Sequence, residues 1–143
     1  MANTTVRKPR PGENMHLIDA LGYRLPLAGW VSILHRASGL LMFVLLPFVI
    51  WMFDTSVTSE ISYGQFTSVF ANGVWGIPGF VFKLVALALI WSYLHHLAAG
   101  LRHVWMDVSH AAVSKEFGRS SAIATLAISL VLTVALGAKL FFF

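Results

Sequence analysis

The segment Ser92–Asp107 reads SYLHHLAAGLRHVWMD and closes a long apolar run of the chain. It carries three of the six histidines, together with an arginine and an aspartate. Ionisable side chains are costly inside a bilayer, so their presence in an apolar segment indicates a functional site. In a helix that turns about 100° per residue, the positions sharing one stripe are His96, Ala99, Gly100, His103 and Asp107. The small residues of that stripe would let a flat group or another backbone approach closely.

The composition of the whole chain predicts an all-α membrane protein. Of its 143 residues, 57% are hydrophobic and 11% are charged, and the mean hydropathy is +0.75. Three apolar segments, residues 31–53, 80–104 and 122–143, are long enough to cross a bilayer as transmembrane helices. The absence of cysteine excludes disulfides, thiolate metal sites and iron–sulfur clusters ligated by this chain.

The same pattern predicts two parts, an N-terminal arm of residues 1–26 and a three-span membrane domain of residues 27–143. Pro47 lies inside the first span, where we expect it to kink the helix. Residues 54–79 and 105–121 are expected to be the two connecting loops.

The basic residues indicate how the chain crosses the membrane. The net charge is +4, and eight of the ten Lys and Arg residues fall towards one face. Those eight are Arg7, Lys8, Arg10, Arg24, Arg36, Arg102, Lys115 and Arg119. Because positive residues favour the cytoplasmic side, we expect a cytoplasmic N-terminus and second loop. The charge is thus explained by topology, and no basic–aromatic pattern indicates nucleic acid as a partner.

A second polar cluster opens the first span, at residues 32–39, SILHRASG. The residues Ser32, His35, Arg36 and Gly39 follow the spacing i, i+3, i+4 and i+7, so they share one helix face. If the first two spans are neighbours, this face and the histidines of the second span lie at the same depth. Such a site suits a haem, whose propionates need cationic partners, or a quinone, whose oxygens need hydrogen-bond donors.

Simpler interpretations of the same residues stay open. His95 is expected to serve interfacial packing or to face lipid, and His103 to cap a helix end or meet headgroups. Gly39 and Gly100 are also explained by plain helix packing. Arg102 and Asp107 could pair with each other.

The two clusters resemble a known family. Residues 24–27, RLPL, followed by SILHRASG, resemble the SxxHRxSG signature of the cytochrome b556 subunit of succinate dehydrogenase. His96, residues 100–103 (GLRH) and Asp107 resemble that family's second signature, HxxxGxRHxxxD. The motifs cover about a fifth of the chain, and the three-span pattern extends the resemblance to nearly all of it.

The resemblance implies an anchor subunit of respiratory complex II, the succinate:quinone oxidoreductase that links the tricarboxylic acid cycle to electron transport. Its partners would be a second membrane anchor subunit, an iron–sulfur subunit and a flavoprotein subunit, which oxidises succinate. The three helices and the second anchor would form a haem-binding bundle around haem b. The short N-terminus favours a bacterial inner (plasma) membrane, crossed several times.

By motif position, the resemblance assigns roles to five residues. His96 would be the axial ligand of the haem iron, with the other ligand supplied by the partner anchor. Ser32 and Arg36 would bind the quinone substrate, and His35, Arg36 and His103 would contact the haem propionates. No residue of this chain would act on succinate itself.

Three alternatives remain at this level. His95 directly precedes His96 and could be the ligand instead, although the small residues Ala99 and Gly100 favour His96. The chain could also be a haem-free anchor with only a quinone site, as in fumarate reductase-type complexes. A small transport subunit with a proton relay would need polar residues through the outer halves of the spans, which are apolar here.

Overall fold

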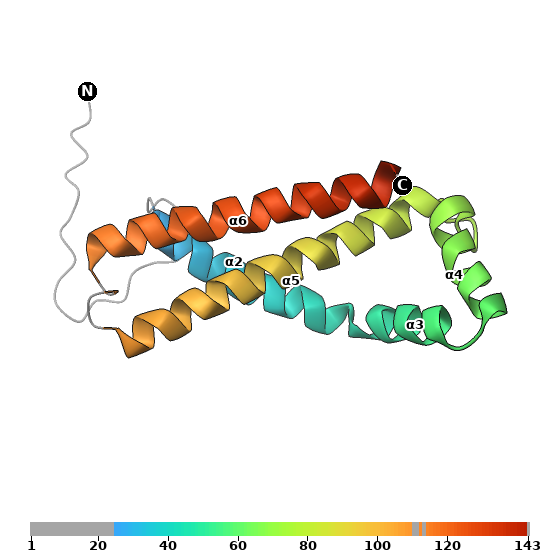
Figure 1. Cartoon of the computed structure of the whole chain (residues 1–143), viewed down its shortest axis with the longest axis horizontal. Coiled ribbons are helices and arrows are strands. Elements are labelled where there is room, and N and C mark those ends of the chain that lie inside the picture. Colours follow the sequence, from blue (N-terminus) through green and yellow to red (C-terminus); the bar gives the residue numbers. More distant parts are fainter. Residues whose placement is uncertain (1–24, 110–111, 113, 143) are drawn as a thin grey trace, which may run out of the picture.

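The structure, a computed structural model, describes residues 25–109, 112 and 114–142, and these fold as an all-α bundle (Figure 1). Its helices are α2 (Leu27–Val44), α3 (Leu46–Val57), α4 (Glu60–Asn72), α5 (Gly79–Val108) and α6 (Lys115–Phe142). Three of them, α2, α5 and α6, are long and apolar enough to cross a membrane, which confirms the expected fold class. The N-terminal arm expected for residues 1–26 lies almost wholly outside the described residues.

The first apolar segment is divided between α2 and α3. The break falls at Leu45, two residues before Pro47, and Pro47 occupies the first turn of α3. Proline lacks a backbone N–H and its ring clashes with the carbonyl four residues earlier, so it favours the start of a new helix over the middle of an old one. The expected kink is therefore a change from one helix to the next.

Both segments expected to be loops are more helical than the sequence suggested. Residues 54–79 contain α4, whose first turn is closed by a reciprocal capping box between Ser59 and Ser62. Gly73 ends this helix with φ +84°, a conformation that glycine adopts without strain. In the second segment, residues 105–121, α5 continues to Val108 and α6 begins at Lys115. Local capping and helix propagation thus shorten both connections.

Helix α5 is the centre of the bundle, because it packs against both α6 and α2 (Figure 1). At the point where the three helices meet, Val31, Ala99 and Ala122 are fully buried and form the apolar core. Two of these three side chains are single methyl groups, which lets the helix backbones approach closely. Close approach of small residues is how helices gain packing energy in lipid, where apolar burial provides no driving force.

The α5–α6 contact, called here the α5–α6 seam, is lined by small and polar residues on both helices. Its buried members on α5 are Ser92, His95, Ala99 and Arg102, and those on α6 are Ala122, Thr125, Ser129, Thr133 and Gly137. The hydroxyls of Thr125 and Thr133 donate to the carbonyls of Ser121 and Ser129, four residues earlier in their own helix. Polar groups in the seam are thus largely satisfied within the chain, as lipid surroundings require.

Large apolar side chains cover the outside of the bundle. Phe43 is 74% exposed and Val131 is 65% exposed, and many other large hydrophobic residues of α2, α5 and α6 are similarly open. An exposed apolar surface of this extent needs a lipid or protein environment. The chain is therefore a multi-pass integral membrane protein.

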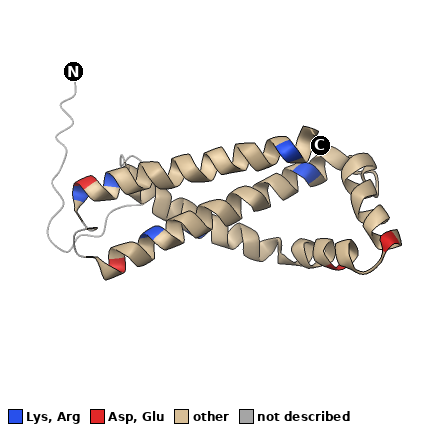
Figure 2. Ribbon diagram, viewed as in Figure 1, with Lys and Arg blue, Asp and Glu red and all other residues tan. Residues whose placement is uncertain are grey.

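Arg102 is a cationic side chain that is buried inside the bundle. Arg102 is only 8% exposed, and its guanidinium donates from Nε to the Ser121 hydroxyl at 2.9 Å and from an NH2 nitrogen to the Gly118 carbonyl at 3.3 Å. Both acceptors lie on α6, so Arg102 joins α5 to α6 rather than pairing with Asp107. Figure 2 shows the positions of the charged residues along the bundle.

We expect Arg102→Met to lower the free energy of unfolding by about 1.5–3 kcal/mol, because it removes two hydrogen bonds made by a charged donor. Denaturant unfolding of the purified protein in detergent would measure the change. Arg119→Met is the matched control, since Arg119 is exposed and lies beside Gly118 and Ser121, the two α6 residues that Arg102 contacts. Equal stability of the two variants would contradict the role of Arg102.

Candidate functional site

Helices α2 and α5 bring three histidines together, called here the α2–α5 histidine cluster. The rings of His35 and His96 are stacked, with centroids 4.1 Å apart and planes 17° from parallel. The ring of His103 is tilted against that of His35, with centroids 5.2 Å apart and planes at 55°. The two polar clusters seen in the sequence therefore meet, because α2 and α5 are neighbours as expected.

The hydrogen bonds of His96 determine which of its nitrogens is available. Its Nδ1 lies 3.0 Å from the backbone carbonyl oxygen of His35 and 3.3 Å from the hydroxyl of Ser38. A carbonyl can only accept, and Ser38 already donates its proton to that same carbonyl at 2.8 Å. The proton of the neutral ring therefore sits on Nδ1, which leaves the Nε2 lone pair for another group.

Glycines make room for these rings. A Cβ atom at Gly39 would lie 2.9 Å from Cε1 of His96, closer than such atoms can normally approach. Gly100 faces His35, whose Nε2 would be 3.5 Å from an added Cβ. The small residues Ala99 and Gly100 were expected to allow close approach of either a flat group or another helix. The structure shows the approach of a helix, because Ala99 packs in the core against Val31 of α2 and Gly100 faces His35 of α2.

The adjacent histidine, His95, lies in a different environment. It is fully buried, its Nδ1 is 3.3 Å from the Ser129 hydroxyl, and its ring stacks on Trp91 at 5.5 Å between centroids. The expectation that His95 faces lipid is therefore wrong, and its packing lies within the α5–α6 seam. His96 is only half-buried, so of the two rings His96 is the one that a group outside the bundle can reach.

The other two predicted site residues share the first turns of α2. Ser32 is half-buried and Arg36, one turn later, is exposed. Within the described residues, no hydrogen bond engages either side chain. Both groups are thus placed to donate hydrogen bonds outward, next to the α2–α5 histidine cluster.

Ser38 lies within the first motif, but the sequence assigned it no role. It is fully buried and touches both histidines through its bonds to the His35 carbonyl and His96 Nδ1. Its fixed place in the SxxHRxSG signature was the available signal, because the polar face defined by helical spacing did not include it.

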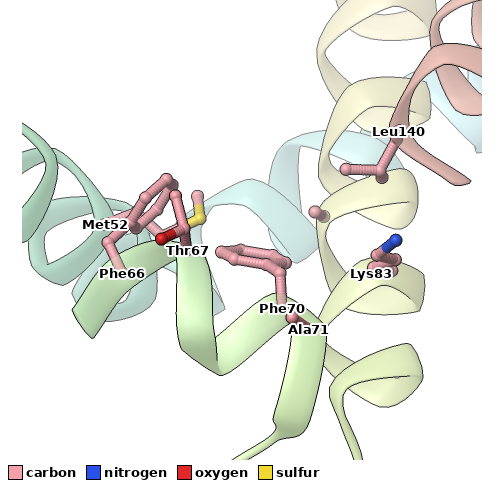
Figure 3. A pocket seen from close by; sticks show the side chains of 8 residues that line it. Met52, Phe66, Thr67, Phe70, Ala71, Lys83 and Leu140 are labelled. Atoms are coloured by element: carbon pink, nitrogen blue, oxygen red, sulfur yellow. The ribbon is translucent and has the colours of Figure 1, made fainter. Parts of the chain in front are cut away.

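A separate cavity of about 410 Å³ lies at the far end of the bundle (Figure 3). Its walls come from α3, α4, α5 and the end of α6, and its lining is largely apolar apart from Thr67 and Lys83. The Lys83 ammonium also lies 5.7 Å from the ring centroid of Phe141. No histidine or carboxylate lines this cavity, which distinguishes it from the α2–α5 site.

The fold and the α2–α5 site together define a small multi-pass membrane protein with a histidine site between two of its helices. The family model of the succinate dehydrogenase/fumarate reductase transmembrane subunit matches residues 14–136, and the chain belongs to this family. The family expected from the two motifs is thereby confirmed.

Bacterial relatives agree with this assignment. The succinate dehydrogenase cytochrome b556 subunit of Paracoccus denitrificans is 30% identical over 112 residues, which cover 78% of this chain and 80% of the relative. The subunit of the same name from Coxiella burnetii is 27% identical over 120 residues, covering 84% and 90%. A third, from Rickettsia felis, is 26% identical over 88 residues, or 62% of each chain. The bacterial relatives and the apolar helices together indicate the inner membrane.

We expect Gly39→Ala to destabilise the protein by about 1–3 kcal/mol, because the added methyl overpacks the contact with His96. The effect should appear although alanine favours helix over glycine. Gly64→Ala is the matched control, since a Cβ at that helical position meets nothing within 4 Å. Thermal denaturation in detergent measures both, and a Gly39→Ala variant as stable as the control would contradict the tight packing.

Proposed function

We propose that this chain is a haem b-binding anchor subunit of a succinate:quinone oxidoreductase and that it helps form the quinone-reduction site. Family membership makes it a membrane subunit of this class of oxidoreductase. The relatives carry the name of a b-type cytochrome. The single observation that carries the proposal within this chain is the hydrogen bond from His96 Nδ1 to the His35 carbonyl.

That bond orients the His96 ring so that its Nε2 could ligate a haem iron. Histidines that ligate metals commonly donate their other ring N–H to a carbonyl or carboxylate, which fixes the tautomer and the ring orientation. Here the His35 carbonyl plays that part, Ser38 supports it, and Gly39 leaves space for the ring. A bound haem b would supply one-electron transfer, and a second anchor subunit would contribute the other axial ligand.

The neighbouring residues suit the periphery of the same group. The rings of His35 and His103 have centroids 5.2 Å apart, and Arg36 is one residue further along α2. Cationic and hydrogen-bonding side chains stabilise carboxylates such as haem propionates. We assign His35, Arg36 and His103 to this contact.

Ser32 and Arg36 are assigned to the quinone. A hydroxyl and a guanidinium one turn apart on α2 offer donors to a quinone oxygen, on which negative charge develops during reduction. Arg36 is exposed and always charged, so it can hold this oxygen and face the propionates from one position.

The charge distribution supports an orientation with this site towards the cytoplasm. Arg36 lies on α2 beside the site, and Arg102, Lys115 and Arg119 lie in the last part of α5 and the first part of α6, whereas Lys83 and Lys139 lie near the start of α5 and the end of α6. Figure 2 shows basic residues at both ends of the bundle. By the positive-inside rule, the site end and the N-terminus are cytoplasmic. The flavoprotein and iron–sulfur subunits would then dock on that side.

His96→Ala should abolish the b-type α-band of the dithionite-reduced minus oxidised spectrum, because it removes one axial ligand. The measurement uses the detergent-purified complex, with its subunit content checked on a gel. His95→Asn is the control and should retain the band, since His95 is sealed inside the bundle.

A band that survives in His96→Ala would move the ligand away from this residue. No band in the unmodified complex would instead favour a haem-free anchor that keeps only the Ser32 and Arg36 site.

Arg36→Ala should lower quinone reductase activity by about tenfold or more, the cost of losing a charged hydrogen bond of roughly 1.5–3 kcal/mol. Ser32→Ala should weaken quinone turnover to a smaller degree and keep the haem spectrum. Succinate oxidation by a soluble dye acceptor should persist in both, because its site is on other chains. Equal loss of the dye and quinone activities would contradict the assignment and indicate failed assembly, and Arg119→Ala is the matched control.

A further inference from the structure

The cavity of about 410 Å³ between α3, α4, α5 and α6, called here the Lys83 cavity, combines apolar walls with one cation. Figure 3 shows Met52 and Phe66 on its α3–α4 side, and Lys83 and Leu140 on its α5–α6 side. Among the lining residues, Lys83 is the charged one. A hollow of this composition fits an amphiphilic anion, because the apolar part of such a ligand is buried while its charged end meets the ammonium.

Lys83 lies at the depth of a lipid headgroup. It follows the first residue of α5, Gly79, by four positions, which is about 6 Å along the helix. Its side chain is half-buried, so the apolar stem can pack on the bundle while the ammonium reaches the membrane interface, as long basic side chains near helix ends do. The headgroups of phospholipids occupy the same interfacial level.

The surroundings of Lys83 leave its charge open to an external anion. The ammonium lies 5.7 Å from the ring centroid of Phe141, a cation–π contact that does not exhaust its three N–H donors. Asp54 on α3 and Glu60 on α4 are the acidic residues described at this end, and both are exposed and outside the cavity lining. Lys139, exposed on α6, adds positive potential at the same end.

We propose that the Lys83 cavity binds an anionic phospholipid, with the lipid phosphate on the Lys83 ammonium and an acyl chain in the apolar part of the cavity. A second apolar hollow, of about 530 Å³, begins close by, because its lining includes Phe141 and Leu87, which is one turn after Lys83. This hollow offers contact to a second acyl chain. A phosphate ion without chains would leave the apolar walls of both hollows uncovered.

The lipid site is separate from the α2–α5 histidine cluster. Lys83 and His96 are both on α5, but the helical rise between them is about 20 Å. The proposal therefore does not rest on the haem and quinone assignments. By the charge distribution described above, the lipid would belong to the outer leaflet.

The test is the thermal midpoint of the intact, detergent-purified and delipidated complex, measured with added phosphatidylglycerol, phosphatidylcholine or inorganic phosphate. A ligand that binds the folded protein raises this midpoint. Phosphatidylglycerol should raise it more than either of the others. An equal rise with phosphatidylcholine would overturn the role of the charge, and an equal rise with inorganic phosphate would overturn the role of the acyl chain. No rise with phosphatidylglycerol would overturn the proposal as a whole.

Variants of the two lysines locate the response. Lys83→Gln should need about tenfold more phosphatidylglycerol for the same rise, because it loses a charge-assisted hydrogen bond. Lys83→Arg should respond like the unmodified complex, since it keeps the charge. Lys139→Gln is the matched control, because Lys139 is a cation at the same end that does not line the cavity. An unchanged response in Lys83→Gln, or an equal loss in Lys139→Gln, would overturn the site.

A cavity-filling variant tests the acyl chain while Lys83 stays in place. Ala71 lines the cavity from α4 and is exposed, so Ala71→Phe can narrow the cavity without repacking a buried contact. This variant should also lose most of the response to phosphatidylglycerol. Ile61→Phe is its control, because Ile61 is 78% exposed on the same helix and outside the cavity lining. A full response in Ala71→Phe would overturn the placement of the chain.

Discussion

The hydrogen bond between His96 Nδ1 and the His35 carbonyl is the interaction on which the site depends. It joins α2 to α5 in surroundings where bulk water cannot replace a lost partner. It also fixes the tautomer of His96 and so decides which nitrogen faces outward. Gly39 leaves room for the His96 ring, and the Ser38 hydroxyl donates a hydrogen bond to the same His35 carbonyl.

Adjacent histidines in one helix serve different purposes because they face different neighbours. His96 points to α2 and stays half-exposed, whereas His95 points into the α5–α6 seam and is completely buried. Both use Nδ1 within the bundle. The difference lies in Nε2, which is accessible in one ring and enclosed in the other, so a ligand from outside can reach only the first.

Several polar side chains are buried between the helices of this apolar protein, and most of them are hydrogen-bonded. Arg102 donates hydrogen bonds to Ser121 and Gly118 on α6. The hydroxyls of Thr125 and Thr133 donate hydrogen bonds to backbone carbonyls of α6 itself. Small side chains bring the helices close enough for these bonds, since Val31, Ala99 and Ala122 meet at full burial. Assembly of the membrane domain therefore rests on close packing and on satisfied polar groups together.

The sequence by itself determined the helical membrane class, the three spans and the two polar faces, because hydropathy and a helical period of 3.6 residues are local properties. It also indicated the family through the spacing of the two motifs. Helix α4 and the extension of α5 to Val108 were not expected, because capping and propagation outweighed the polar composition of those segments. Only the tertiary structure separated the environments of His95 and His96, gave Ser38 its contacts with both histidines of the site and placed Arg102 against α6. Those outcomes depend on which helix lies against each face of α5, and a residue's position along one helix does not contain that information.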